Sequence, residues 1–286
     1  MFKALLPEDL IKKVPSMFTE AAADRTSNKY QHISTIRVLD GLKREGFVPV
    51  TAMQSKVRIA DKANFTKHLI RLRHVDARPS VGGLFPEIVL INSHDGLSSY
   101  RLMSGIYRLI CSNGLIAGNT YEQVKIRHQG DIVHNVIEGT YEVIKNSKKM
   151  IESAEEMERV KLSIHEKIIF AEAAHAIRFD GSETGENIKP VSLLMPRRFV
   201  ESNKNDLFTV FNIVQENIIK GGIAGYAKDS YGRMAKRIRT RAIKSIDQDT
   251  MLNRALWSLS EKMMKLKTQG TTGVGDEGIT TLPSKV

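Results

Sequence analysis

The fold is decided by the stretch Lys67-His68-Leu69-Ile70-Arg71-Leu72-Arg73-His74. Successive side chains of a β-strand point to opposite faces, so a strand here places Lys67, Arg71 and Arg73 on one face. Ile70 and Leu72 then share the other face. Such a strand is cationic on one side and apolar on the other. We interpret it as part of a sheet that turns a basic face toward a polyanion.

The same alternation occurs in two further segments. Within residues 54–58 it puts Lys56 and Arg58 on one face, and within residues 124–127 it puts Lys125 and Arg127 on one face. A sheet built from these strands repeats its basic face. The predicted DNA contacts of the sheet are Lys56, Arg58, Lys67, Arg71, Arg73, Lys125 and Arg127.

The overall composition agrees with a polyanion partner. The chain has 43 Lys and Arg against 32 Asp and Glu, which gives a net charge of +11. Its isoelectric point is near 9.6, in the range where a basic domain suggests nucleic-acid binding. Hydrophobic residues make up 41% of the 286 residues, so the chain can also bury a sizeable core.

Cysteine content and hydropathy indicate the cellular compartment of the protein. The single cysteine, Cys111, excludes an intrachain disulfide and a cysteine-rich zinc module, and it fits a reducing environment. A run of about 18 apolar residues, which a transmembrane helix needs, is absent, and residues 1–7 are too short an apolar start for a signal peptide. We expect a cytoplasmic protein without a membrane partner.

The periodicity predicts an α+β fold, with an antiparallel β-meander preceded by a helix and followed by a long-helix C-terminal half. Residues 1–30 are expected to be an irregular lead-in. Residues 31–130 form the β-rich core, with a helix at 33–45 and strands between 47 and 127. Residues 131–267 form a helical half packed on that core as one compact domain. Residues 268–286, rich in glycine, are expected to be a disordered tail.

Turn signals divide the β-rich core. The stretch Ser93-His94-Asp95-Gly96 has hairpin-turn chemistry, and Ser112-Asn113-Gly114 carries the Asn-Gly signature of a second turn. These turns predict separate strands at residues 87–92, 98–103, 106–111 and 121–127.

A second basic concentration lies between Tyr226 and Ser245. It contains seven Lys and Arg residues against the single acidic residue Asp229. Because glycines precede it and two tyrosines lie within it, we expect a loop leading into a helix that grips phosphates. The predicted DNA contacts here are Arg233, Lys236, Arg237, Arg239 and Arg241.

The sequence gives little support to catalysis. No Gly-x-x-x-x-Gly-Lys-Ser/Thr stretch exists, which argues against a P-loop. His165-Glu166 begins like a zincin motif but lacks the second histidine, and His175 is about 15 Å away along a helix. His94 and Asp95 could act as a base and its orienting carboxylate, although turn chemistry explains them. Cys111 ends an apolar strand, as a small buried hydrophobe would. We expect no catalytic residue, no metal and no cofactor.

Several segments together resemble a known family. Residues 89–96 and 108–115, followed by residues 212–217, 220–222 and 252–257, resemble the phage/plasmid-like proteins described as domain of unknown function 932. The resemblance spans most of residues 30–265 and implies a mobile-element setting in bacteria, but no activity. The order of helix, basic β-meander and long helix is also similar to ring-forming single-strand annealing proteins of recombination. That similarity implies single-stranded DNA binding without ATP, by a homo-oligomer, with a ring as the form of assembly that those proteins take.

The function we predict is ATP-independent binding or annealing of single-stranded DNA in the recombination of a phage or plasmid. One alternative is a non-catalytic mobile-element protein that counters a host defence system. A third is a metal-dependent nuclease that uses His94 and Asp95. Binding of single strands that depends on salt separates the first two, and cleavage that depends on metal identifies the third.

Overall fold

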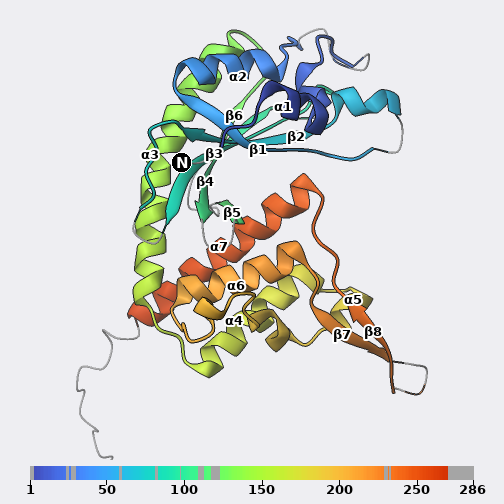
Figure 1. Cartoon of the computed structure of the whole chain (residues 1–286), viewed down its shortest axis with the longest axis vertical. Helices are drawn as coiled ribbons and strands as arrows, with labels where there is room; N and C mark the ends of the chain where they lie inside the picture. The colour runs from blue at the N-terminus through green and yellow to red at the C-terminus, as the bar shows by residue number, and fades with distance from the viewer. Residues whose placement is uncertain are drawn as a thin grey trace, which may run out of the picture.

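An antiparallel sheet forms one end of the molecule (Figure 1). The structure, a computed structural model, describes residues 3–23, 26, 30–57, 60–80, 83–96, 98–108, 113–116, 123–228, 231 and 233–269. Strands Phe47–Gln54 (β1), His68–His74 (β2), Leu84–Asn92 (β3) and Tyr100–Arg108 (β4) follow one another as a meander. The far end of β4 pairs with Asn113–Ile116 (β5), and its beginning pairs with Val124–Ile126 (β6). Helix Thr35–Arg44 (α2) precedes the meander, which confirms the predicted α+β class.

The C-terminal half is helical. Its long helices are Ile132–Arg159 (α3), Ile164–Phe179 (α4), Leu207–Lys220 (α6) and Ile246–Gln269 (α7). Between them lie the short elements Glu183–Glu186 (α5), Pro190–Leu194 (η3) and Phe199–Glu201 (η4), and the hairpin of Ala224–Lys228 (β7) and Met234–Arg239 (β8). The side chains of Asp131, Ser163 and Asp206 accept hydrogen bonds from the first turns of α3, α4 and α6. These caps explain why the three helices begin where they do.

Helix α3 joins the two halves (Figure 1). Val136, Val143, Met150 and Met157 recur at seven-residue steps along it and are fully buried, as expected for one apolar face of a helix. The first two belong to the core between the sheet and α2, and the last two belong to the core among α4, α6 and α7. The two halves therefore share the apolar face of one helix.

The prediction of an irregular lead-in is wrong for part of residues 1–30. Helix Pro7–Lys13 (α1) and the 3-10 helix Pro15–Phe18 (η1) lie there. Pro7 presets the backbone angle of a first helical residue, and Leu10 anchors the helix in the core at 0% exposure. The Leu5 N–H also donates to the Pro49 carbonyl oxygen at 2.7 Å, which ties this segment to β1.

Two boundaries within the sheet also differ from prediction. Residues 98–103 and 106–111 were predicted as separate strands, whereas β4 runs unbroken from Tyr100 to Arg108. Asn113 and Gly114 do not form the predicted turn, because they lie in β5 opposite Arg108 and Tyr107. An Asn-Gly pair forms a tight turn only when it lies between the last paired residues of two strands. In the pairing of β4 with β5, Asn113 and Gly114 are themselves paired residues. Cys111 lies outside the described residues.

The turn at Ser93–Gly96 connects two paired strands as predicted, since β3 and β4 are antiparallel neighbours. Gly96 has a φ of 75°, which suits its position in a turn. Residues 268 and 269 belong to α7, so the predicted disordered tail is wrong for them, and residues 270–286 lie outside the described part of the chain. Among the described helices, none is long and apolar enough to cross a membrane.

Candidate nucleic-acid interface

The predicted basic face of the sheet is largely covered. Arg71 and Arg73 do share one face, but their residues are only 6% and 2% exposed. Leu69 on the same face packs with Val89, Met103 and, from the start of α7, Ile246. The assignment of Arg71 and Arg73 to a solvent-facing DNA surface is therefore wrong. A second layer of the fold lies over that face.

A buried carboxylate accounts for both arginines. Arg71 Nη1 donates to Glu87 Oε2 at 2.8 Å, and Arg73 Nη2 donates to Glu87 Oε1 at 2.6 Å. The Arg73 guanidinium also lies 4.4 Å from the ring centre of Phe85 and 4.6 Å from that of Tyr107. Charged groups enter a protein interior when they are paired and hydrogen-bonded. These two cations therefore have a structural role.

The other predicted contacts of the sheet are dispersed. Lys67 makes an ion pair with Asp247 of α7 at 2.6 Å. Lys56 lies beyond the end of β1 and is exposed, as are Lys125 in β6 and Arg127 just after it. Arg58 lies outside the described residues. The pattern of alternation thus found the strands, but it does not gather these cations on one open face.

The second basic segment forms a hairpin and not the predicted helix. Tyr226 pairs with Arg237 and Ala224 pairs with Arg239 across β7 and β8. Directly opposed residues project from the same face of a two-stranded ribbon. Tyr226, Arg237 and Arg239 therefore share one face, and all three are exposed. The basic composition of this segment does not distinguish a helix from a strand, and the cross-strand pairing that forms the hairpin is a tertiary feature.

Glycines hold the base of the hairpin against the helical half. Gly221 ends α6 with a φ of 64°, and a Cβ there would lie 2.6 Å from the Arg241 carbonyl carbon. The Gly222 N–H donates to the Thr240 carbonyl oxygen at 2.8 Å, and the Thr240 N–H donates to the Ile223 carbonyl oxygen at 2.9 Å. The hairpin is fixed at its base and extends away from the helices (Figure 1).

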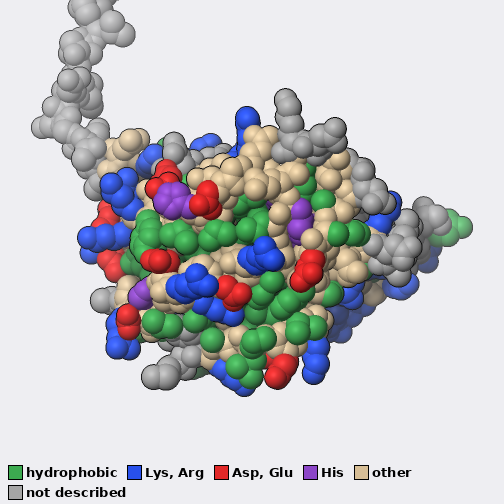
Figure 2. Space-filling model, turned by 90° about the horizontal axis from the view of Figure 1, so that it is seen from above, with side chains coloured by type: hydrophobic (Ala, Val, Ile, Leu, Met, Phe, Trp, Pro, Cys, Tyr) green, Lys and Arg blue, Asp and Glu red, His purple; other side chains and the backbone are tan. Residues whose placement is uncertain are grey.

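Aromatic and basic side chains also occur together near the hairpin tip. Tyr231 is 80% exposed, and the Arg233 guanidinium lies 5.4 Å from its ring centre. Met234 is 73% exposed and Lys236 is also exposed. At the end of the molecule that carries α1 and α2, by contrast, positive and negative side chains are intermixed (Figure 2). The hairpin is thus a surface of cations and large apolar groups.

His94 and Asp95 do not form an open catalytic pair. His94 is 0% exposed, and its Nε2 lies 3.2 Å from Thr35 Oγ1. Asp95 Oδ1 accepts a hydrogen bond from Ser93 Oγ at 2.7 Å, as in a turn. Within the described residues no group of three or more histidine, cysteine, aspartate and glutamate residues is placed to hold a metal. This geometry gives no support to the nuclease alternative.

Sequence reasoning missed a histidine cluster around His94, which we define as His32, His68, His94 and His128; the last three are buried and His32 is half-buried. The ring centre of His94 lies 4.9 Å from that of His32, 5.5 Å from that of His68 and 6.5 Å from that of His128. Burial lowers the pKa of His68 and of His128 to about 4 and the pKa of His94 to about 2. The rings of His68, His94 and His128 are therefore neutral at physiological pH. They come from four separate segments, so no local motif reveals the cluster.

Hydroxyl and amide groups connect this histidine cluster. Ser16 Oγ lies 2.8 Å from His68 Nδ1, and Thr35 Oγ1 lies 2.9 Å from His68 Nε2. Asn92 Nδ2 donates to Thr35 Oγ1, and Asn92 Oδ1 lies 3.0 Å from His128 Nε2. The network joins the N-terminal segment and α2 to the ends of β2 and β3. It therefore fixes the N-terminal segment on the sheet.

Comparison with known proteins places this α+β architecture in a family. The chain belongs to the family described as domain of unknown function 932 (DUF932), whose family model matches residues 23–257. The matched range includes the sheet, the histidine cluster and the β7–β8 hairpin. The chain is also 40% identical over 267 residues to UPF0380 protein YfjQ and to UPF0380 protein YafZ of Escherichia coli (strain K12), covering 92% of this chain and of each relative. No solved structure matches.

Proposed function

We propose that this protein binds single-stranded DNA without ATP and that the β7–β8 hairpin is the contact. The observation that carries the proposal is the exposed ribbon face of Tyr226, Arg237 and Arg239. Guanidinium groups neutralise backbone phosphates and release counterions, which favours association. An aromatic ring beside them offers a stacking surface for a base. One face of the ribbon thus carries both kinds of group.

The exposed apolar groups favour single strands over duplex DNA. Tyr226 is 50% exposed, Tyr231 80% and Met234 73%. Exposed apolar side chains that lie together with polar residues mark an interaction surface. Bases of a single strand present their flat faces to such side chains, whereas a duplex stacks those faces on one another. We therefore expect tighter binding to unpaired strands.

Annealing is the activity that this mode of binding supports. Contacts to phosphates and base faces leave the pairing edges of the bases open. Two strands held in this way on neighbouring subunits can pair without ATP. We include a homo-oligomer in the proposal for this reason, with native mass spectrometry as its test. Protein that is monomeric both alone and with oligothymidylate would remove the annealing step but leave the binding step.

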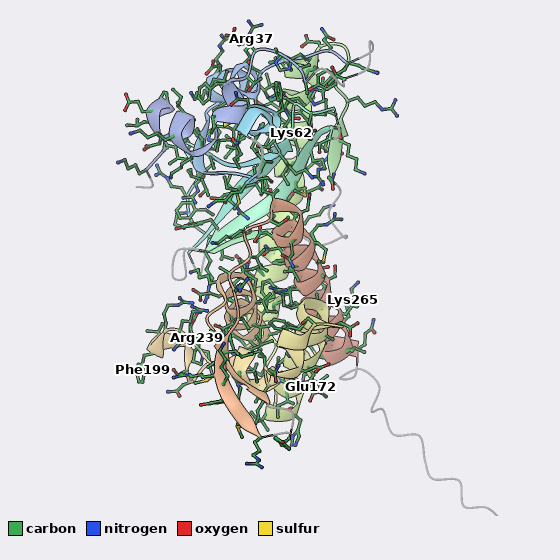
Figure 3. The ribbon with its side chains drawn as sticks, turned by 90° about the vertical axis from the view of Figure 1, so that its right-hand side faces the viewer. Arg37, Lys62, Glu172, Phe199, Arg239 and Lys265 are labelled. Carbon is green, nitrogen blue, oxygen red and sulfur yellow. The ribbon has the colours of Figure 1, made fainter. Side chains whose placement is uncertain are left out.

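Fluorescence anisotropy with oligothymidylate at several salt concentrations tests the binding step. In the variant Arg237→Gln/Arg239→Gln, each lost phosphate contact should reduce the slope of log affinity against log salt by roughly 0.7. The matched control is Arg37→Gln/Arg44→Gln, which removes the same charge from exposed positions on α2. Figure 3 shows Arg37 at the top of the molecule and Arg239 in its lower half.

The two variants together decide the proposal. We expect weaker binding and a shallower slope for the hairpin variant, with the control close to wild type. If both variants change the slope equally, binding reflects overall charge and the hairpin is not the contact. If the wild-type protein binds neither oligothymidylate nor duplex DNA at low salt, the proposed function is wrong.

A further inference from the structure

A cavity of about 500 Å³ lies at the base of the β7–β8 hairpin. Its described lining comes from the end of α4, from the residues on either side of α5, from β7, and from β8 with the residues after it. The polar members of that lining are Arg178, Ser182, Asn187, Arg239 and Arg241. A volume of this size falls within the range of small-molecule sites in proteins. It is large enough for a nucleotide.

The charged side chains that line this cavity are positive. Among the carboxylates whose side chains the structure describes, none makes an ion pair with Arg178, Arg239 or Arg241. Arg178 is half-buried, its Nε is buried without a hydrogen-bond partner, and its guanidinium lies 5.0 Å from the ring centre of Phe179. Burial lowers the pKa of Arg178, which reports the cost of holding this cation away from water. A buried hydrogen-bond donor is normally satisfied, so the Arg178 Nε–H has capacity for a ligand.

The walls of the cavity are held in place before any ligand binds. The Tyr226 N–H donates to the Asn187 carbonyl oxygen at 3.2 Å, so β7 is attached to the segment that follows α5. Ser182 Oγ donates to the Phe179 carbonyl oxygen at 2.7 Å and accepts from the Gly185 N–H at 3.1 Å. A preformed site loses little entropy when it binds its ligand.

We propose that this cavity binds a phosphate monoester of a nucleotide, with Arg178, Arg239 and Arg241 as its cationic ligands. Guanidinium groups present paired donors that match the oxygens of phosphate, and Ser182 and Asn187 add polar groups at the rim. The inference rests on the proposed function, because the cavity lies at the base of the hairpin that we propose as the DNA contact. The same chemistry could also take a free nucleotide.

Three probes distinguish these sources. They are oligothymidylate with a 5′-phosphate, the same strand with a 5′-hydroxyl, and thymidine 5′-monophosphate. We expect the phosphorylated strand to bind about tenfold or more tightly than the hydroxyl strand, as charge-assisted hydrogen bonds would give. Arg178→Gln should remove that difference, whereas the matched control Arg37→Gln should keep it. Thermal unfolding of each variant shows whether it is folded.

A second substitution keeps the test decisive if Arg178→Gln is unfolded. Arg241 is exposed, so Arg241→Gln should fold and should also reduce the preference for the 5′-phosphate. If both strands bind equally and thymidine 5′-monophosphate does not saturate the protein, the pocket proposal is overturned even when the hairpin binds DNA. If thymidine 5′-monophosphate saturates the wild type but not Arg178→Gln, while no strand binds, the pocket holds and the proposed DNA function fails.

Discussion

Gly225 of β7 lies against the backbone of Asn187, where a Cβ at position 225 would stand 2.1 Å from the Asn187 carbonyl oxygen. That oxygen also accepts the hydrogen bond from the Tyr226 N–H. The ribbon can approach this closely only because residue 225 has no side chain. Gly225 therefore contributes, with the contacts at the base of the hairpin, to its orientation relative to the helical half.

Gly225→Ala should displace the hairpin and weaken DNA binding. The methyl group would force the backbone apart, at a cost of about 1–3 kcal/mol in the free energy of unfolding. Urea unfolding and anisotropy with oligothymidylate measure the two effects. Gly130→Ala is the control, since a Cβ there meets nothing within 4 Å and only its φ of 69° causes strain. Unchanged DNA binding by a folded Gly225→Ala protein would contradict the role given to this contact.

Glu87→Gln should strongly destabilise the protein. Glu87 is 2% exposed and pairs with both Arg71 and Arg73. Removing its charge leaves two buried guanidinium groups without their carboxylate, which costs on the order of 3–5 kcal/mol in the free energy of unfolding. Urea unfolding at neutral pH measures the change. The control Glu138→Gln removes a carboxylate that is 68% exposed and should cost under about 1 kcal/mol. Equal effects would rule out a special role for the buried pair.

Glu87 also shows what sequence reasoning could reach. The alternation around Arg71 and Arg73 is enough to predict the strand and which residues share a face, because that depends only on local geometry. Whether the face meets water depends on Glu87 in another strand and on Ile246 from α7. Those partners lie far away in the sequence. A local pattern therefore predicts the sheet but not its burial.

For the candidate site too, sequence reasoning found some features and missed others. Composition alone located the basic segment that contains Arg237 and Arg239. Whether that segment forms a helix or a hairpin depends on tertiary contacts, because Gly221 and Gly225 lie against the backbone of other segments. His94 was noticed beside Asp95, but its contacts with His68 and His128 arise only when the sheet forms. Charge can be counted from a sequence, whereas burial and pairing depend on tertiary structure.

The buried members of the histidine cluster should make the protein sensitive to mild acid. In an unfolded chain histidine binds a proton below about pH 6.5, whereas burial keeps the pKa of His68 and His128 at about 4 in the fold. Between these values the unfolded chain binds more protons, so the free energy of unfolding falls as the pH falls. Each such histidine contributes up to about 1.4 kcal/mol per pH unit. Urea unfolding across this window measures the slope.

His128→Asn separates this effect from the titration of carboxylates. The substitution should lower the free energy of unfolding. It should also reduce the slope of that free energy against pH by the contribution of one histidine. His134→Asn is the control, since His134 is 63% exposed on α3 and its loss should leave the slope nearly unchanged. A slope in His128→Asn as steep as that of the wild type would show that other groups cause the acid sensitivity.

Tyr226→Ala should separate base stacking from charge in the hairpin. The tyrosine ring shares the ribbon face with Arg237 and Arg239 and is 50% exposed. Loss of one stacked base costs about 1–3 kcal/mol of binding free energy, but an uncharged ring releases no counterions. Anisotropy titrations should therefore show weaker binding at every salt concentration with an unchanged slope. Tyr141→Ala, which alters a 52% exposed tyrosine on α3, should leave both the affinity and the slope at wild-type values. Wild-type affinity in Tyr226→Ala would mean that the strand contacts only the arginines of the hairpin.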